Sequence, residues 1–180
     1  MDNFDINYAP TYDPASVQYM RDELTDVGFR ELHSLDEVDQ AILREDEDTV
    51  LLVINSVCGC AAGGARPGVA YALQHTVIPD HLVSVFAGQD KREVEYIRQR
   101  FLHDYVPSSP CVVLFQKGEI RFIMERKDMV NKEAEEIGNM LRQVFDQYCT
   151  RRGPSLSPEA YNRLSYTIQC SSNIPRLQNN

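Results

Sequence analysis

The feature that most constrains this chain is a strand-like segment, residues 49–54, which is apolar without interruption from Val50 and runs almost directly into Cys58-Gly59-Cys60. Its length and its β-branched composition are typical of a buried strand. The residues that follow the cysteines, 61–74, are rich in alanine and then carry apolar positions that suit a helix. We therefore expect a helix to begin at or near Cys58, with two thiols at a strand-to-helix turn.

A thiol in this position is predicted to be reactive. Cys58 would face unpaired backbone N–H groups and the positive end of the helix dipole, which favour the thiolate. Cys60 is close enough to close a disulfide, with Cys60 lying further inside the turn. Such a small ring would contribute only about 1.6 kcal/mol to stability and would be strained, which makes it easy to reduce. Gly59 is expected to supply the backbone angles of the ring. The pair is thus predicted to form a working redox bond.

Four runs of residues resemble the bacilliredoxin family. They are NSVCGCAAG at 55–63, ARP at 65–67, VFAGQDK at 85–91 and PSSP at 107–110. The resemblance extends over residues 12–149 and implies a thioredoxin-like α/β fold, in which a mixed central sheet is flanked by helices. It also implies an enzyme that removes bacillithiol from mixed disulfides on cytosolic proteins. Bacillithiol, or a similar low-molecular-weight thiol, would be a co-substrate, and no bound cofactor is expected.

Periodicity elsewhere predicts the order of elements. Before the strand and helix described above, we expect helices at 13–27 and 34–42 with an extended segment at 29–32 between them. After them, we expect a strand at 81–87, a helix at 90–102, a hairpin at 111–124 and a helix at 131–148. Asp13-Pro14 and Ser34 are the expected caps of the first two helices. Pro67 is expected to kink the helix that follows the cysteines.

This pattern divides the chain into three parts. Residues 1–11 are a polar arm, either disordered or docked on a partner, and residues 12–149 form the thioredoxin-like domain with an N-terminal helical extension. Residues 150–180 form a C-terminal extension. Within it, Ser157-Pro158 with Tyr161, Leu164 and Ile168 predicts one short helix laid on the body or on a second subunit, or else a loose tail.

Ser109-Pro110 precedes a predicted core strand. By resemblance, this is where thioredoxin-like proteins carry a cis-proline beside the active cysteine. The residue before such a proline offers its backbone N–H and C=O to an extended substrate. Ser109 and Pro110, together with Gly59, are therefore the predicted substrate-binding residues.

The remaining cysteines have weaker claims to a redox role. Cys111 begins an apolar run and is expected in the core, and Cys170 lies in the tail. Cys149, near the end of the last helix, is either a third redox thiol, an intermolecular partner or part of the helix packing. Arg66 lies roughly 12 Å along the helix from Cys58, too far to stabilise the thiolate directly. We interpret it as a helix anchor or a partner contact.

Composition limits the partners. The chain has 180 residues, 27 of them acidic and 18 basic, and its net charge of -9 argues against nucleic acid or an anionic membrane as the main partner. No apolar run is long enough for a membrane helix, the first residues lack the features of a signal peptide, and the five cysteines have no framework spacing. We therefore expect a cytoplasmic protein. The resemblance implies that its partners are S-thiolated proteins, and a homodimer is one possible state.

Two alternatives stay open at this level. The same cysteines would serve a general protein disulfide isomerase or oxidant. They would also serve a metal-binding module, although the four histidines (33, 75, 81 and 103) do not have finger spacing from the pair, so no metal is expected.

Overall fold

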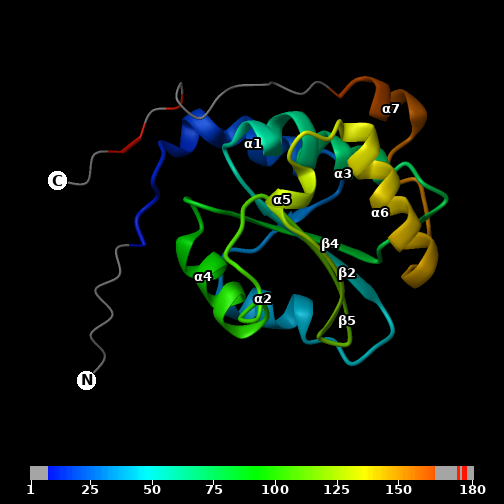
Figure 1. Ribbon diagram of the computed structural model, residues 1–180, viewed down its shortest axis with the longest axis horizontal. Coiled ribbons are helices and arrows are strands. Elements are labelled where there is room, and N and C mark those ends of the chain that lie inside the picture. Colours follow the sequence, from blue (N-terminus) through cyan, green and yellow to red (C-terminus); the bar gives the residue numbers. More distant parts are fainter. Residues whose placement is uncertain (1–7, 165–173, 175, 178–180) are drawn as a thin grey trace.

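The protein is built on a five-stranded mixed sheet with the strand order β1-β4-β2-β5-β6 (Figure 1). The computed structural model describes residues 8–164, 174, 176 and 177. The strands of this sheet are β1 (Arg30–Glu31), β2 (Thr49–Asn55), β4 (His81–Phe86), β5 (Cys111–Gln116) and β6 (Glu119–Met124). Strands β1, β4 and β2 are parallel to one another, while β5 and β6 run antiparallel to their neighbours. This arrangement confirms the predicted thioredoxin-like fold.

The central strand is β2, as its apolar sequence predicts. All seven of its residues are buried, and it pairs with β4 on one side and β5 on the other. Because side chains alternate along a strand, Leu51 and Val53 contribute to one core cluster, whereas Leu52 and Ile54 contribute to the other. The sheet therefore has an apolar core on each face, with α2 and α4 covering one face and α3 and α6 the other (Figure 1).

Seven α-helices surround the sheet in the described residues. They are α1 (Pro14–Thr25), α2 (Leu35–Ile42), α3 (Arg66–Ala72), α4 (Lys91–Arg100), α5 (Arg126–Met129), α6 (Ala134–Tyr148) and α7 (Pro158–Asn162). The predicted caps of the first two are present: Asp13 accepts a bond from the Ser16 N–H at 3.0 Å, and Ser34 accepts one from Glu37 at 3.2 Å. The short α5, which has too few residues to show a period, was not predicted. No helix in the described part of the chain has the length and apolarity needed to cross a lipid bilayer.

Helices α3 and α6 approach each other closely because glycine lies at their contact. A Cβ atom on Gly68 would lie 2.8 Å from Cγ2 of Ile137, and one on Gly138 would lie 2.8 Å from the carbonyl oxygen of Gly68. Both distances are shorter than a van der Waals contact. This contact fixes the helix that follows the cysteines against the core.

Both chain ends pack on the body where they are described. At the N-terminal side, the Thr11 N–H donates to the Gly88 carbonyl at 2.7 Å. In the C-terminal extension, β7 (Arg151–Arg152) pairs with β3 (Val77–Ile78), and α7 follows. Neither of these short strands was predicted.

The described part of the extension holds one short helix, α7, which ends at Asn162, before Leu164 and Ile168 of the predicted helix. Tyr161 and Leu164 pack against the core cluster around α6, so the helix lies on the body of the chain. Arg176 also forms a bridge with Tyr12, and Ile174 is buried nearby. Ile168 and Cys170, along with residues 1–7, lie outside the described residues.

Candidate active site

The two adjacent thiols lie where β2 ends and a helix begins. The carbonyl oxygen of Cys58 accepts bonds from the N–H groups of Ala61 at 3.0 Å and Ala62 at 3.2 Å, so Cys58 caps the helix whose first residues are Gly59 and Cys60. The Cys58 N–H donates to Oγ of Ser56 at 3.3 Å. The expected helix start at or near Cys58 is therefore confirmed.

The helix does not begin with regular α-helical turns. Residues Ala61–Ala65 form a π-helical turn, in which the Arg66 N–H reaches back five residues to the carbonyl oxygen of Ala61. Pro67 follows and has no N–H to donate to an α-helical bond. The irregularity expected at Pro67 thus takes the form of a wider turn just before it. Single π turns of this kind are frequent at functional sites.

A buried arginine holds the turn to the helix. The Arg66 side chain is 0% exposed and donates from Nη1 to the Ser56 carbonyl oxygen at 2.9 Å and to Oδ1 of Asn55 at 3.2 Å. Its Nε forms an ion pair with Glu23 on α1. The interpretation of Arg66 as a helix anchor is confirmed, and the anchor also fixes the two residues that lead into the cysteines.

Sequence reasoning missed the partners of that arginine. Asn55 accepts a bond from the Ser56 N–H at 2.8 Å and donates one to the Met20 carbonyl at 2.9 Å, so it ties β2 to α1. Glu23 is buried on the same face of α1 as Met20. The position of Glu23 within the apolar stripe of this helix was the signal that could have revealed the ion pair with Arg66, because a buried charge requires a partner.

Both thiols reach the surface. Cys58 and Cys60 are both free and both half-buried, and Cys60 is the second residue of the helix that Cys58 caps. Beside Cys60, Gly59 and Gly63 have no side chains that could cover it. Exposure alone does not decide which sulfur attacks first.

The structure shows Gly59 with both thiols free, without the disulfide ring for which its backbone freedom is predicted. Its φ angle is not left-handed, and a Cβ atom built on it would meet nothing within 4 Å. Among the described glycines, left-handed φ angles occur at Gly28, Gly88 and Gly118. With both thiols free, Gly59 is an ordinary residue of a first helical turn, and its backbone angles do not require glycine.

Ser109 and Pro110 lie beside this turn. The peptide bond between them is cis, as expected. Cys111 pairs with Ile54 in the sheet, so Pro110 stands opposite the last residue of β2, three positions before Cys58. The preceding loop is fixed by Ser108, whose Oγ accepts the Arg126 N–H at 2.8 Å. The fold thus brings the two predicted substrate-binding residues to the end of β2 that leads into the cysteine turn.

Cys111 and Cys149 are not part of this site. Cys111 is 2% exposed, and burial raises the pKa of its thiol to about 12. Cys149 is 7% exposed, and burial raises the pKa of its thiol to about 11. Its Sγ atom accepts a bond from Oγ1 of Thr49 at 3.6 Å, at the opposite end of β2 from Cys58. This geometry supports a packing role at the end of α6.

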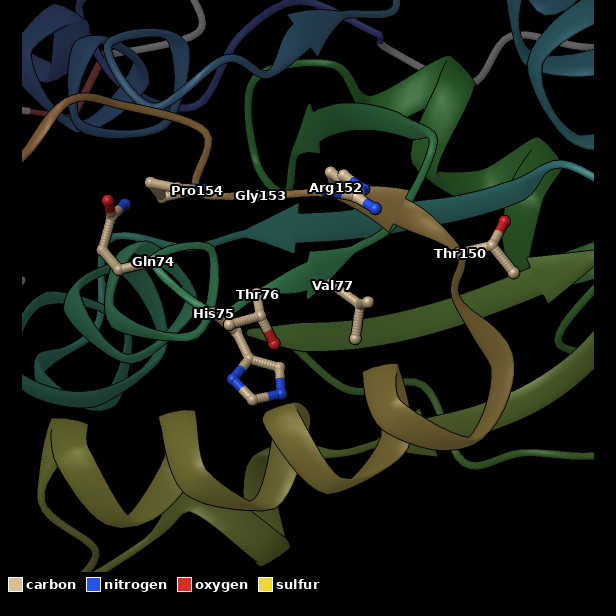
Figure 2. A pocket seen from close by; sticks show the side chains of 8 residues that line it. All are labelled: Gln74, His75, Thr76, Val77, Thr150, Arg152, Gly153 and Pro154. Carbon is tan, nitrogen blue, oxygen red and sulfur yellow. The ribbon is translucent and has the colours of Figure 1, made fainter.

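The Cys149 end of the molecule has a pocket of its own. The pocket has a volume of about 470 Å³ and is lined by residues of the paired strands β3 and β7 and of the segments that flank them (Figure 2). Its lining residues are Gln74, His75, Thr76, Val77, Thr150, Arg152, Gly153 and Pro154. It contains no thiol. In the part of the chain that the structure describes, no group of three or more His, Cys, Asp or Glu side chains is placed to hold a metal ion.

Comparison with known proteins identifies the family. A family model described as disulphide isomerase matches residues 12–149. A bacilliredoxin of Salinibacter ruber is 46% identical over 143 residues, which cover 79% of this chain and 83% of the relative. A bacilliredoxin of Staphylococcus haemolyticus is 39% identical over 150 residues, covering 83% of this chain and 98% of the relative.

A solved structure of a Malassezia sympodialis thioredoxin aligns with a TM-score of 0.43 at 15% identity, covering 67% of this chain and 90% of that one. The family match and the two bacilliredoxin relatives extend over most of the chain, including the strand, the cysteine turn and the helix described above. This chain therefore belongs to the bacilliredoxin family and is a thiol-disulfide oxidoreductase.

Proposed function

We propose that the protein removes a low-molecular-weight thiol, bacillithiol or a close analogue, from mixed disulfides on other proteins. The observation that carries the proposal is the position of Cys58 at the open start of a helix. Its thiol is half-buried, and in the described residues the backbone N–H groups of Gly59 and Cys60 have no hydrogen-bond partner. Free N–H groups at a helix N-terminus stabilise a thiolate, which is the nucleophile in thiol-disulfide exchange.

The first step transfers the small thiol to the enzyme. The Cys58 thiolate attacks the sulfur of the small thiol in the mixed disulfide. A new bond forms between Cys58 and that sulfur, the old disulfide bond breaks, and the client cysteine leaves as a thiolate that takes up a proton. The client is then restored, and the enzyme carries the adduct.

The second step releases the small thiol. The Cys60 thiolate attacks Sγ of Cys58, the small thiol leaves as a thiolate, and an intramolecular disulfide remains. The mixed disulfide has gained two electrons, which leave with the client thiol and the small thiol, and the enzyme has lost two. A dithiol reductant, or two external thiols, must therefore reduce the Cys58–Cys60 bond before another cycle. The half-buried position of both thiols supports these roles, because each must reach a disulfide.

Client binding is assigned to the segment before β5. In the described part of the chain, the backbone N–H and C=O of Ser109 make no hydrogen bond. An extended client segment would pair with them as an added strand. The adjoining Pro110 and the exposed Gly59 would border the same client segment.

A second candidate is general protein disulfide isomerisation, which the description of the matching family model favours. Both activities use the same cysteines. They differ in the substrate, because an isomerase acts on disulfides between two protein cysteines.

Intact mass spectrometry of the protein after incubation with a bacillithiolated client tests the proposal. The wild type is expected to free the client and become a disulfide, Cys58→Ala to leave the client modified, and Cys60→Ala to stall with one small thiol on Cys58. The double variant Cys111→Ala, Cys149→Ala is the matched control and should transfer nearly as well as the wild type. If the wild type leaves the mixed disulfide intact but refolds a protein with scrambled disulfides, the isomerase candidate replaces this one.

A further inference from the structure

A polar cavity of about 250 Å³ lies at the end of the sheet opposite the cysteines and has no role in thiol transfer. One of its lining residues is His81, the first residue of β4, which pairs with Val50 near the start of β2. Its polar lining residues are Arg30, Gln40, Arg44, Asp80, His81 and Arg151. On a protein of net charge -9, three arginines thus share one cavity with a single carboxylate.

The three arginines reach the cavity from separate elements. Arg30 lies in the edge strand β1, Arg44 follows the residue that caps the end of α2, and Arg151 lies in β7. The pairing of β7 with β3, in which Arg151 lies opposite Ile78, sets the position of the third arginine. Arg151 also lies beyond residues 12–149, the part of the chain that matches the family model. The C-terminal extension therefore supplies one wall of this cavity.

Two of the arginines keep a positive charge that no carboxylate neutralises. Nη1 of Arg151 donates to the carbonyl oxygens of Asp80 at 3.0 Å and Pro79 at 3.4 Å, which fixes the side chain with neutral acceptors. Within the described residues, the Arg30 guanidinium makes no hydrogen bond or ion pair. The Asp80 carboxylate is engaged by Thr49, whose N–H and Oγ1 both donate to its Oδ2 atom at 2.8 Å. These guanidinium groups are therefore available to an anion.

The third arginine is only partly neutralised. Nε of Arg44 donates to Oδ1 of Asp46 at 3.0 Å, and its Nη2 pairs with Asp46 and with Asp48. The Asp48 carboxylate also bonds to Nε2 of His81 at 2.8 Å. Within the described residues, Nη1 of Arg44 has no partner, so one edge of its guanidinium remains free to bind a ligand.

We propose that this cavity binds a small phosphomonoester, whose phosphate is held by Arg30, Arg44 and Arg151. Guanidinium groups form paired hydrogen bonds with phosphate, which is close to a dianion at neutral pH. A tetrahedral phosphate offers oxygens in several directions and suits donors from three elements, whereas a carboxylate offers two oxygens in one plane. Pockets for drug-sized ligands have volumes of about 300–1,000 Å³, so the smaller cavity limits the organic part to a few atoms.

An NMR titration of the full chain tests the proposal. The probes are glycerol 3-phosphate, the uncharged glycerol and inorganic phosphate, at an ionic strength held constant with sodium chloride. Glycerol 3-phosphate is expected to shift the amide signals of residues 28–31, 40–44, 80–83 and 151 in a saturable way, and glycerol should not. Inorganic phosphate should shift the same signals with a larger Kd. Because each contact is a hydrogen bond between charged groups, Arg30→Gln should raise the Kd of glycerol 3-phosphate about tenfold.

Further variants make the result specific. Arg151→Gln should raise the Kd to a similar extent, whereas Arg163→Gln, which removes an exposed arginine at the end of α7 outside the cavity, should leave it unchanged. The spectra of the free variants report whether each is folded. An unchanged Kd in folded Arg30→Gln and Arg151→Gln, or shifts that do not saturate, would overturn the proposal.

Two other results would assign the cavity to a different ligand. An equal Kd for inorganic phosphate and glycerol 3-phosphate would show that the free anion is the ligand and would overturn the phosphomonoester. Tighter binding of a phosphoserine peptide than of glycerol 3-phosphate would replace the small molecule with a phosphorylated protein. None of these outcomes depends on thiol transfer, because the cavity contains no cysteine.

Discussion

The two ends of β2 place cysteines in opposite environments. At the carboxyl end, Cys58 and Cys60 lie half-buried at a helix start, beside backbone N–H groups that have no partner among the residues the structure describes. At the amino end, Cys149 is enclosed against Thr49, and burial raises the pKa of its thiol to about 11. One strand thus leads into two accessible thiols at one end and lies against a packed thiol at the other.

The comparison teaches that location in the fold, not the residue type, determines the chemistry of these thiols. Cys111 has the same side chain as Cys58, but it lies in the core strand beside β2, where burial raises the pKa of its thiol to about 12. A thiol without access to water or a free N–H stays protonated and unreactive. At the helix start, the Cys58 thiol has access to water and lies beside N–H groups that have no partner among the described residues.

The largest expected effect is on alkylation. A thiol with a pKa of about 11 is only roughly one part in a thousand thiolate at pH 8. Under native conditions iodoacetamide should therefore modify Cys58 and Cys60 at least about 100-fold faster than Cys111 and Cys149. Mass mapping of a labelling time course measures the four rates, and labelling in urea, where the rates should converge, is the control. Comparable native rates for Cys149 and Cys58 would abolish the distinction between the two ends.

The reactive end is also predicted to depend on its buried arginine. Arg66→Met would leave the Glu23 carboxylate buried without its ion pair and would free the Ser56 carbonyl. Breaking a buried pair in this way lowers the free energy of unfolding by about 3–5 kcal/mol. Urea denaturation measures this loss.

The matched control for the buried pair is an exposed one. Arg44→Met removes a surface pair with Asp46 and should cost at most about 1 kcal/mol. Thiol transfer by Arg66→Met, assayed where the variant is still folded, should be slower because the turn into Cys58 is less fixed. Equal stability losses in the two variants would contradict the anchoring role.

The packed end predicts a dependence of stability on alkaline pH. The pKa of Cys149 is higher in the folded protein than the ordinary value of 9.0, so between pH 9 and 11 the folded state holds a proton that the unfolded state has lost. The free energy of unfolding should then fall as pH rises, by about 1.4 kcal/mol per pH unit for this group. Denaturation at pH 8, 9, 10 and 11 should show a shallower fall in Cys149→Ala than in the wild type. Parallel curves would mean that the thiol is not held neutral.

The smallest expected effect concerns the glycines. Gly59→Ala adds a methyl group in open space at a helical residue, so the dithiol form should gain at most about 1 kcal/mol in free energy of unfolding. Gly138→Ala should instead lose stability, because its Cβ would crowd the Gly68 carbonyl at 2.8 Å. Thermal unfolding under reducing conditions compares the two. A loss of stability in Gly59→Ala would show that the turn needs glycine even without the disulfide.

Local patterns were sufficient for the elements that carry the thiols. The apolar run of β2, the cap residues Asp13 and Ser34, and the small residues after Cys60 act within a few positions of one another, and each produced the predicted element. The cis bond before Pro110 was reached through resemblance instead of a local rule. Elements of two residues, such as β3 and β7, leave no period to detect, and they were missed.

The sequence by itself therefore determined the order of the longer strands and helices and the placement of two cysteines at a strand-to-helix turn. Only the tertiary structure decided what surrounds them. It joined Glu23 to Arg66 across 43 positions, placed Cys149 against Thr49 across 100, and brought Arg30 and Arg151 to one cavity. Such contacts depend on how the helices pack on the sheet, and hydrophobic burial, which drives that packing, has no direction that a local pattern could encode.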